Sequence, residues 1–363
     1  MTLIYSLTIA LFFLWSGLSK YPLLTEIEGI IVGLSLLVTA YIKNKEIVFP
    51  KKSGVIFLII FCLVQIPYLF IFKSHYSTHF LLLFIGGVLF LLASYNLSDY
   101  IKKHFHIYFI TISSIIGIIY LFSRFIYDPF NLLKDVDLLL TNPKYPHILL
   151  GDLSAVTFVL SLYQYMKQKK YIYLLTLFLS IFLIAISFSR SALVSIGAGV
   201  FYLMYIKGVI SRHKKKVVLF FILISIAFIL NGLTKSIIFN RIYYIQALYV
   251  FITHPLGIGM GNFSTLFDYG ISTSVNSIYT HCLFLEVLIG TGVWGVSFFI
   301  WFYKTLKNVF INKDDNKNIA CILAIVTLLA NFTFNSTYTI PIMFWIFFIC
   351  LGTSLTTNKQ FNP

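Results

Sequence analysis

Charged residues are scarce in this chain. Only 11% of its 363 residues are charged and 59% are hydrophobic, whereas soluble domains carry roughly 25% charged residues. A soluble globular fold is therefore excluded, and the chain is expected to be an all-α polytopic membrane protein. Its four cysteines are isolated in apolar runs without a CxxC pair, which indicates neither a disulfide framework nor a zinc site. No internal repeat or inverted symmetry is visible, although many transporters have one.

Acidic residues are the scarcer of the two charged kinds. The chain has 12 of them against 27 basic residues, so its formal net charge is +15. Such a charge can indicate nucleic-acid binding. In a membrane protein, lysine-rich cytoplasmic loops explain it better, because basic residues fix the orientation of the spans. Membrane lipids are therefore expected as partners, and nucleic acid is not.

Apolar runs long enough to cross a bilayer, about 17–22 residues each, predict twelve spans in one integral membrane domain covering residues 1–363. The spans lie at about 2–19, 27–43, 54–73, 79–95, 104–123, 147–166, 171–188, 190–207, 217–232, 281–303, 318–333 and 340–357. The first run lacks a basic start and a cleavage site, so it is interpreted as a retained span. With the N-terminus inside, most basic residues fall in cytoplasmic loops. We therefore expect both termini on the cytoplasmic side of the cytoplasmic (inner) membrane.

Two long loops are expected on the outer side, at about 124–146 and 233–280. The second is too rich in Ile, Tyr and Phe to be disordered, and residues 237–253 predict a helix at the outer interface that is ended by Pro255. The glycines at 257–261 are expected to let the backbone reverse sharply. A nucleotide-binding loop is excluded, because these glycines lie outside and follow a helix.

Arginine marks the outer side of the predicted topology. Arg190 lies in the first turn of the helix after a short outer turn, and Arg241 opens the helix of the second loop. A guanidinium grips phosphate through two hydrogen bonds, and free amides at a helix N-terminus also favour an anion. A lipid-linked diphosphate would be the natural anion here. The alternatives are an acidic partner for Arg190 and lipid headgroups for either arginine. Arg124 and Lys144 of the first loop are secondary candidates.

His281, at the start of the tenth span, is the best acid–base candidate, because imidazole takes up a proton near neutral pH. Glu286 lies five residues on, about 140° around a helix, so we expect it to orient a neighbouring segment and not to form a dyad with His281. His254 is more often structural than catalytic in such a position, and Tyr279 is a secondary candidate. Asp152, inside the sixth span, is a costly charge without an evident partner, and its role stays open.

Three motifs in this chain resemble those of the O-antigen ligase and polymerase superfamily (WaaL and Wzy types). His281-Cys282 followed by Gly292 and Gly295 is similar to the signature H-[NSQ]-x9-G-x-x-G. The run 188–192 resembles an SRxA segment, and Arg241 followed by His254-Pro255-Leu256-Gly257-x-Gly259 resembles R…HPLxGxG. The motifs occur in the family's order over about 187–295, with a long outer loop between spans 9 and 10. Apart from the resemblance, Gly292 and Gly295 are expected to allow close packing against an adjacent helix.

The resemblance implies a GT-C-like membrane glycosyltransferase that uses undecaprenyl-diphosphate-linked glycans, with no metal, nucleotide sugar or other cofactor. Arg190 and Arg241 would hold the donor diphosphate. His281 would act as base on the acceptor hydroxyl or assist the leaving group. The active site would face the periplasm or exterior, and flippase and chain-length regulator proteins are expected partners.

Cys282 stands where the ligase signature has Asn, Ser or Gln. This residue and the modest outer loop favour a polymerase that joins repeat units of O-antigen or capsular polysaccharide. The close alternative is a ligase that transfers finished chains to lipid A core. The alternative of another class is a polysaccharide or lipid transporter or flippase.

Overall fold

The computed structural model describes residues 22–72, 74–127, 146–187, 189–212, 242–263, 279–311 and 318–355. The secondary structure of these residues is helical, and no strand occurs among them. Six helical segments are long and apolar enough to cross a membrane. The chain is therefore an all-helical, multi-pass membrane protein, as the composition predicts.

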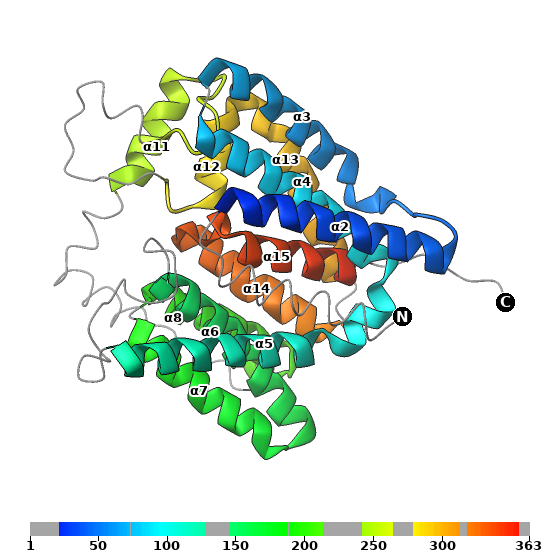
Figure 1. Cartoon of the computed structure of the whole chain (residues 1–363), viewed down its shortest axis with the longest axis vertical. Coiled ribbons are helices and arrows are strands. Elements are labelled where there is room, and N and C mark those ends of the chain that lie inside the picture. The colour runs from blue at the N-terminus through cyan, green and yellow to red at the C-terminus, as the bar shows by residue number, and fades with distance from the viewer. Residues whose placement is uncertain are drawn as a thin grey trace.

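One side of the helix bundle combines the first described helices with α11, which lies within the second predicted outer loop, and with the helices directly after that loop (Figure 1). It contains α2 (Pro22–Asn44), η1 (Lys51–Ser53), α3 (Val55–Phe72), α4 (His75–Asn96), α11 (Ile242–Thr253), α12 (Leu283–Thr291), η4 (Gly292–Gly295) and α13 (Val296–Ile311). Both α2 and α3 pack on α4, while α13 packs on α3 and α11 on α12.

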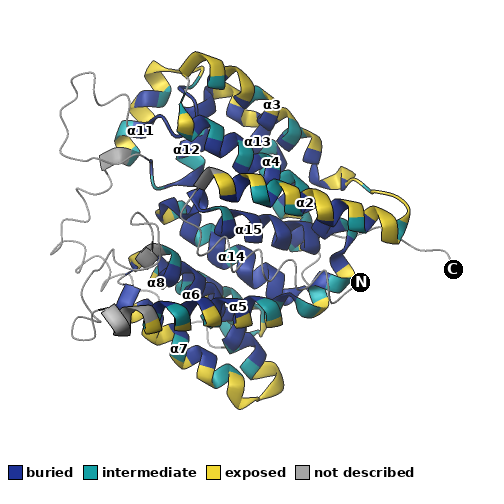
Figure 2. Cartoon of the chain, in the orientation of Figure 1, coloured by how far each residue is buried: buried dark blue, intermediate teal, exposed yellow. Residues whose placement is uncertain are grey.

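The other side is built from consecutive helices in the middle of the chain (Figure 1). These are α5 (Ser98–Tyr127), α6 (Pro146–Gln168), α7 (Tyr171–Ser187), α8 (Arg190–Ile206) and the short α9 (Val209–Arg212). Helix α6 packs against α5, α7 and α8. Exposed apolar side chains line the outer faces of α3 and α7 (Figure 2), as a lipid-facing surface requires.

Two shorter helices, α14 (Ile319–Phe334) and α15 (Pro341–Ser354), lie between the two sides. Every residue of α15 from Ile342 to Ser354 is buried. A helix that is apolar on all sides has to be enclosed by protein or lipid, and here neighbouring helices enclose it. The turn η5 (Ser336–Thr339) joins the two helices and is buried throughout.

Ten of the twelve predicted spans fall on described helices, and the spans at 2–19 and 217–232 lie outside the described residues. Four of the ten, at α7, α8, α14 and α15, have only 14 to 17 residues. The number of spans therefore stays a prediction. The predicted first outer loop lies outside the described residues except at its ends, and the expected helix at 237–253 is described from Ile242 to Thr253.

The tenth predicted span is not one continuous helix. Helix α12 begins at Leu283, with Cys282 as its N-cap, and ends at Thr291, with Gly292 as its C-cap, where φ is 55° and ψ is −137°. This backbone conformation is essentially restricted to glycine. A Cβ on Gly292 would also lie 2.1 Å from the carbonyl oxygen of Pro255. The expectation of packing against an adjacent helix is thus corrected: Gly292 meets a loop, and a Cβ on Gly295 would meet side chains of α12 itself.

Candidate functional site: buried carboxylates at one end of the bundle

Helices α2, α4, α6, α8, α12 and α15 begin, and α14 ends, at the same end of the bundle (Figure 1). Buried polar residues gather there. We call this region the polar end. Three fully buried carboxylates lie there, those of Glu26, Asp152 and Glu286. Each belongs to a hydrogen-bonded or ion-paired cluster that reaches the segment 335–339.

Asp152 has partners that the sequence did not reveal. Its Oδ1 accepts hydrogen bonds from Ser189 Oγ at 3.3 Å and Ser191 Oγ at 3.2 Å, while its Oδ2 accepts from Asn335 Nδ2 at 3.3 Å. Ser189 is the N-cap of α8, and its Oγ accepts from the amide of Ala192. Negative charge is favoured near a helix N-terminus. The contacts and the helix end together explain how a buried carboxylate is tolerated.

Arg190 is the first residue of α8, as predicted, and it is exposed. Both of its neighbours, Ser189 and Ser191, donate to Asp152. Within the described part of the chain Arg190 makes no ion pair, so the alternative of an acidic partner finds no support there. Asp152 thus fixes the backbone from which the guanidinium extends.

Glu286 binds three separate segments. Its Oε1 accepts from the Gly261 amide at 2.9 Å, and its Oε2 accepts from the amide and Oγ1 of Thr280, both at 3.0 Å, and from Tyr338 OH at 3.3 Å. Burial, and after it the charge of Glu286, raise the pKa of the Tyr338 phenol, so this hydroxyl stays a hydrogen donor. Glu286 therefore ties the loop at 254–263 and the segment before α12 to η5.

His281 has a left-handed backbone, with φ of 54°, and a partly exposed side chain. Such a conformation is uncommon outside glycine, and strained positions of this kind cluster at functional sites. The His281 carbonyl oxygen lies 3.4 Å from Tyr244 OH, which also lies 3.0 Å from the Thr333 carbonyl oxygen. Thr333 is two residues before Asn335, which bonds Ser191 beside Arg190. His281 and Arg190 thus flank the same end of α14.

The motif at 254–259 packs on the break after α12. Three backbone hydrogen bonds join them: Ile258 to Ile289 at 3.0 Å, Gly259 to Gly290 at 2.8 Å and Val293 to Pro255 at 2.9 Å, each from amide to carbonyl oxygen. The first two bonds satisfy carbonyls at the end of α12 that would otherwise lack donors, and the third is accepted by the loop. Two of the sequence motifs, at 254–259 and 281–295, therefore form one structural unit.

Side chains of α3 and α4 anchor this loop. The Tyr68 hydroxyl donates to the carbonyl oxygen of Leu256. Ser77 Oγ donates to the Met260 carbonyl oxygen at 3.0 Å. Tyr279, which precedes the Glu286-bound Thr280, is buried and packs edge-on against Tyr76 and Phe80, each with ring centroids 6.0 Å apart. The aromatic start of α4 therefore supports the segment that leads into His281.

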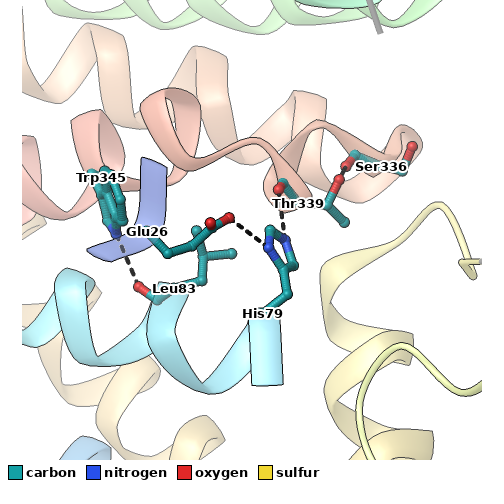
Figure 3. Close-up of polar contacts among 6 residues, drawn as sticks. All are labelled: Glu26, His79, Leu83, Ser336, Thr339 and Trp345. Atoms are coloured by element: carbon teal, nitrogen blue, oxygen red, sulfur yellow. Dashed lines mark hydrogen bonds and ion pairs between the residues drawn. The ribbon is translucent and has the colours of Figure 1, made fainter. Parts of the chain in front are cut away.

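Sequence reasoning missed a third cluster. His79 of α4 approaches Glu26 of α2, with Nδ1 and Oε1 2.6 Å apart, and its Nε2 lies 3.0 Å from the Thr339 carbonyl oxygen (Figure 3). It also missed the segment 335–339, which contacts all three clusters. The signals were present: two titratable residues at the starts of predicted spans, and a run of polar residues between the apolar α14 and α15.

Of the remaining candidates, His254 has a described side chain, and no hydrogen bond among the described residues joins it to this network. His254 is exposed, with Nδ1 2.9 Å from Thr253 Oγ1. Arg241 and Lys144 lie outside the described residues, as does the side chain of Arg124, whose backbone belongs to α5. Among the side chains that the structure describes, no group of three metal-ligating residues comes together.

The polar end includes a partly exposed imidazole, that of His281, and an exposed guanidinium, that of Arg190. Neighbours of both residues bond to buried carboxylates. An imidazole can exchange a proton with a hydroxyl, and a guanidinium can stabilise an anion. Comparison of the sequence with models of known protein families and with curated proteins gives no match.

Proposed function

We propose that this chain is a membrane glycosyltransferase that polymerises oligosaccharide repeat units carried on undecaprenyl diphosphate. One observation carries the proposal: motifs that resemble those of the O-antigen polymerase and ligase superfamily are joined in space. The HPLGIG run at 254–259 is hydrogen-bonded to the glycine break that follows His281. Contacts at the end of α14 also support the proposal: Tyr244 bonds the carbonyl oxygens of His281 and Thr333, and Asn335 bonds Ser191, the neighbour of Arg190.

The proposed reaction assigns one task to each residue. His281 takes the proton of the acceptor hydroxyl, whose oxygen attacks the anomeric carbon of the donor sugar. The bond from that carbon to the diphosphate oxygen breaks, and the electron pair leaves with the undecaprenyl diphosphate. Arg190, joined by Arg241 as the motif predicts, stabilises the charge on the leaving diphosphate. The site faces the periplasm or exterior in this proposal.

The backbone of His281 decides which substitution tests its role. Alanine would alter both the imidazole and a left-handed residue, whose φ is 54°. Asparagine tolerates that conformation better than most residues but cannot act as a base at neutral pH. His281→Asn should therefore abolish chain extension at an unchanged protein level. Electrophoresis of surface polysaccharide from a strain that carries only the variant measures this, and normal polymer would remove His281 from catalysis.

The same gel separates the proposed polymerase from a ligase. A polymerase deletion strain should retain single repeat units on the lipid anchor, whereas a ligase deletion strain should retain full-length chains that are not transferred. Arg190→Lys keeps the charge but loses the planar fork, so it should reduce chain extension. Full activity of Arg190→Lys would instead assign Arg190 to headgroup contact.

A further inference from the structure

A buried carboxylate–imidazole pair has no part in the reaction proposed above. Figure 3 shows Glu26, near the start of α2, beside His79, near the start of α4. Both side chains are buried, and Glu26 is fully so. His79 uses both ring nitrogens: Nδ1 lies 2.6 Å from Glu26 Oε1, and Nε2 lies 3.0 Å from the Thr339 carbonyl oxygen.

The chemistry of these contacts fixes where hydrogen must be. A carbonyl oxygen only accepts, so His79 Nε2 carries the hydrogen that faces Thr339. At 2.6 Å, His79 Nδ1 and Glu26 Oε1 would repel each other as two lone pairs, so one hydrogen lies between them. The pair is then either imidazolium with carboxylate or imidazole with carboxylic acid. In both forms it shares one proton and has no net charge, which burial favours.

The carbonyl oxygen that accepts from His79 belongs to η5, part of the segment 335–339 that contacts all three clusters of the polar end. Thr339 is the last residue of η5, and its Oγ1 donates to the Ser336 carbonyl oxygen at 2.8 Å, which closes the turn (Figure 3). The preceding residue, Tyr338, donates to Glu286, which holds Thr280 beside His281. Contacts therefore run from α2 and α4, through η5, to the segment before α12.

We propose that Glu26 and His79 are positioning residues: their shared proton clamps η5 and so holds the His281 segment in place. The clamp stands on the contacts of these two residues. Only its effect on polymer synthesis rests on the proposed function. Apart from their 2.6 Å ion-pair contact with each other, Glu26 Oε1 and His79 Nδ1 have no partner among the described residues, and Glu26 Oε2 has none, so within them this contact is what fixes the carboxylate.

Two substitutions of Glu26 distinguish loss of the hydrogen shared with His79 from loss of the carboxylate charge. Glu26→Gln keeps the shape, and its amide can donate to His79 Nδ1 while Nε2 still donates to Thr339. Glu26→Met removes the polar group without leaving a buried charge. Trp345→Phe is the matched control, because it removes another buried bond between α15 and α4, from Trp345 Nε1 to the Leu83 carbonyl oxygen at 2.9 Å (Figure 3).

Cys282 provides a readout that does not depend on catalysis. It is buried and follows His281, whereas Cys350 is buried farther along α15, away from η5. The full-length variants in detergent are treated with a small maleimide, and mass spectrometry measures labelling of each cysteine. Glu26→Met should raise the labelling rate of Cys282 about tenfold, because local opening exposes buried groups without global unfolding. Cys350 should stay protected, and Glu26→Gln and Trp345→Phe should label Cys282 like the unmodified chain.

Unchanged labelling of Cys282 in Glu26→Met would overturn the clamp, as would equal labelling in Trp345→Phe. If Cys282 is labelled as fast in Glu26→Gln as in Glu26→Met, the proposal that a shared hydrogen holds the clamp is overturned. Polymer synthesis is measured in parallel and should fall in Glu26→Met but not in Glu26→Gln. A deletion strain that still makes polymer would refute the proposed function, while the labelling rates would still decide the clamp.

Discussion

The two ends of the bundle handle charge in opposite ways. At the polar end, the carboxylates of Asp152 and Glu286 are fully buried and accept hydrogen bonds from segments far away in the chain. At the other end, which we call the lysine end, Lys167, Lys207 and Lys304 are exposed. Their ammonium groups lie 4.8 to 6.0 Å from the ring centroids of nearby Tyr and Phe side chains.

The two ends differ in whether their charged groups need specific partners. A lysine that extends its stem along apolar surface keeps its charge in water and needs no particular partner. A buried carboxylate has to find donors in fixed positions, because an unpaired one is very costly. Substitutions at the polar end should therefore be damaging and specific, while those at the lysine end should be mild. Four predictions test this contrast, all measured as the shift in thermal unfolding in detergent.

Gly292→Ala should have the largest effect. The φ of 55° is unfavourable for alanine, and its Cβ would lie 2.1 Å from the Pro255 carbonyl oxygen, so the loop cannot stay docked on α12. We expect a loss of about 4 kcal/mol or more, at the extreme of single substitutions. Gly197→Ala is the matched control, because a Cβ there meets nothing within 4 Å and the residue lies in α8. Similar losses in both variants would contradict the docked break.

Glu286→Ala comes next, because it removes one acceptor group from donors in three segments. The amides of Gly261 and Thr280 and the hydroxyl of Tyr338 lose their partner together. The loss should be roughly 3 kcal/mol or more, since each buried donor without a partner is costly. Glu286→Gln keeps the shape and one acceptor oxygen, so it should lose less. A Gln variant as unstable as the Ala variant would mean that the negative charge itself holds the segments.

Much of this architecture follows from local pattern. Apolar runs predict the helices, Arg190 is found at the start of α8 as predicted, and lysine placement anticipates the lysine end. The polar end could not be predicted to the same extent. Asp152 meets Asn335 across 183 residues, and His79 meets Thr339 across 260 residues. No periodicity carries that information, because such contacts depend on how helices distant in sequence pack.

The glycine break after α12 shows the same limit. Gly292 and Gly295 stand out in the sequence, yet their spacing suggested close helix packing. Their role depends on Pro255 and on the loop that reaches the end of α12, which only the three-dimensional arrangement reveals. The spacing of these two glycines thus drew attention to the break but suggested the wrong packing partner, a helix instead of a loop.

Asp152→Asn should have an intermediate effect. The amide oxygen can face Asn335 Nδ2, but the NH2 group then replaces the oxygen that accepts from the Ser189 and Ser191 hydroxyls, so their hydrogens lose that acceptor. A loss of roughly 1–2 kcal/mol is expected for one mismatched buried hydrogen bond. Ser180→Ala is a matched control at a buried hydroxyl whose bond among the described residues stays within its own helix, to the Thr176 carbonyl oxygen, and it should lose less. Equal losses would show that the Asp152 cluster is no more demanding than an ordinary buried hydroxyl.

Lys304→Ala should have the smallest effect of the four and tests the tolerant side of the contrast. The Lys304 ammonium lies 4.8 Å from the centroid of the Phe57 ring, and the side chain is exposed. An exposed cation–π contact contributes roughly 0.5–1 kcal/mol, and the aliphatic stem against Gly54 adds modest packing. The shift should stay below that of Asp152→Asn. If Lys304→Ala were as damaging as a carboxylate substitution, charge at both ends would depend on specific partners, and the contrast between the two ends would fail.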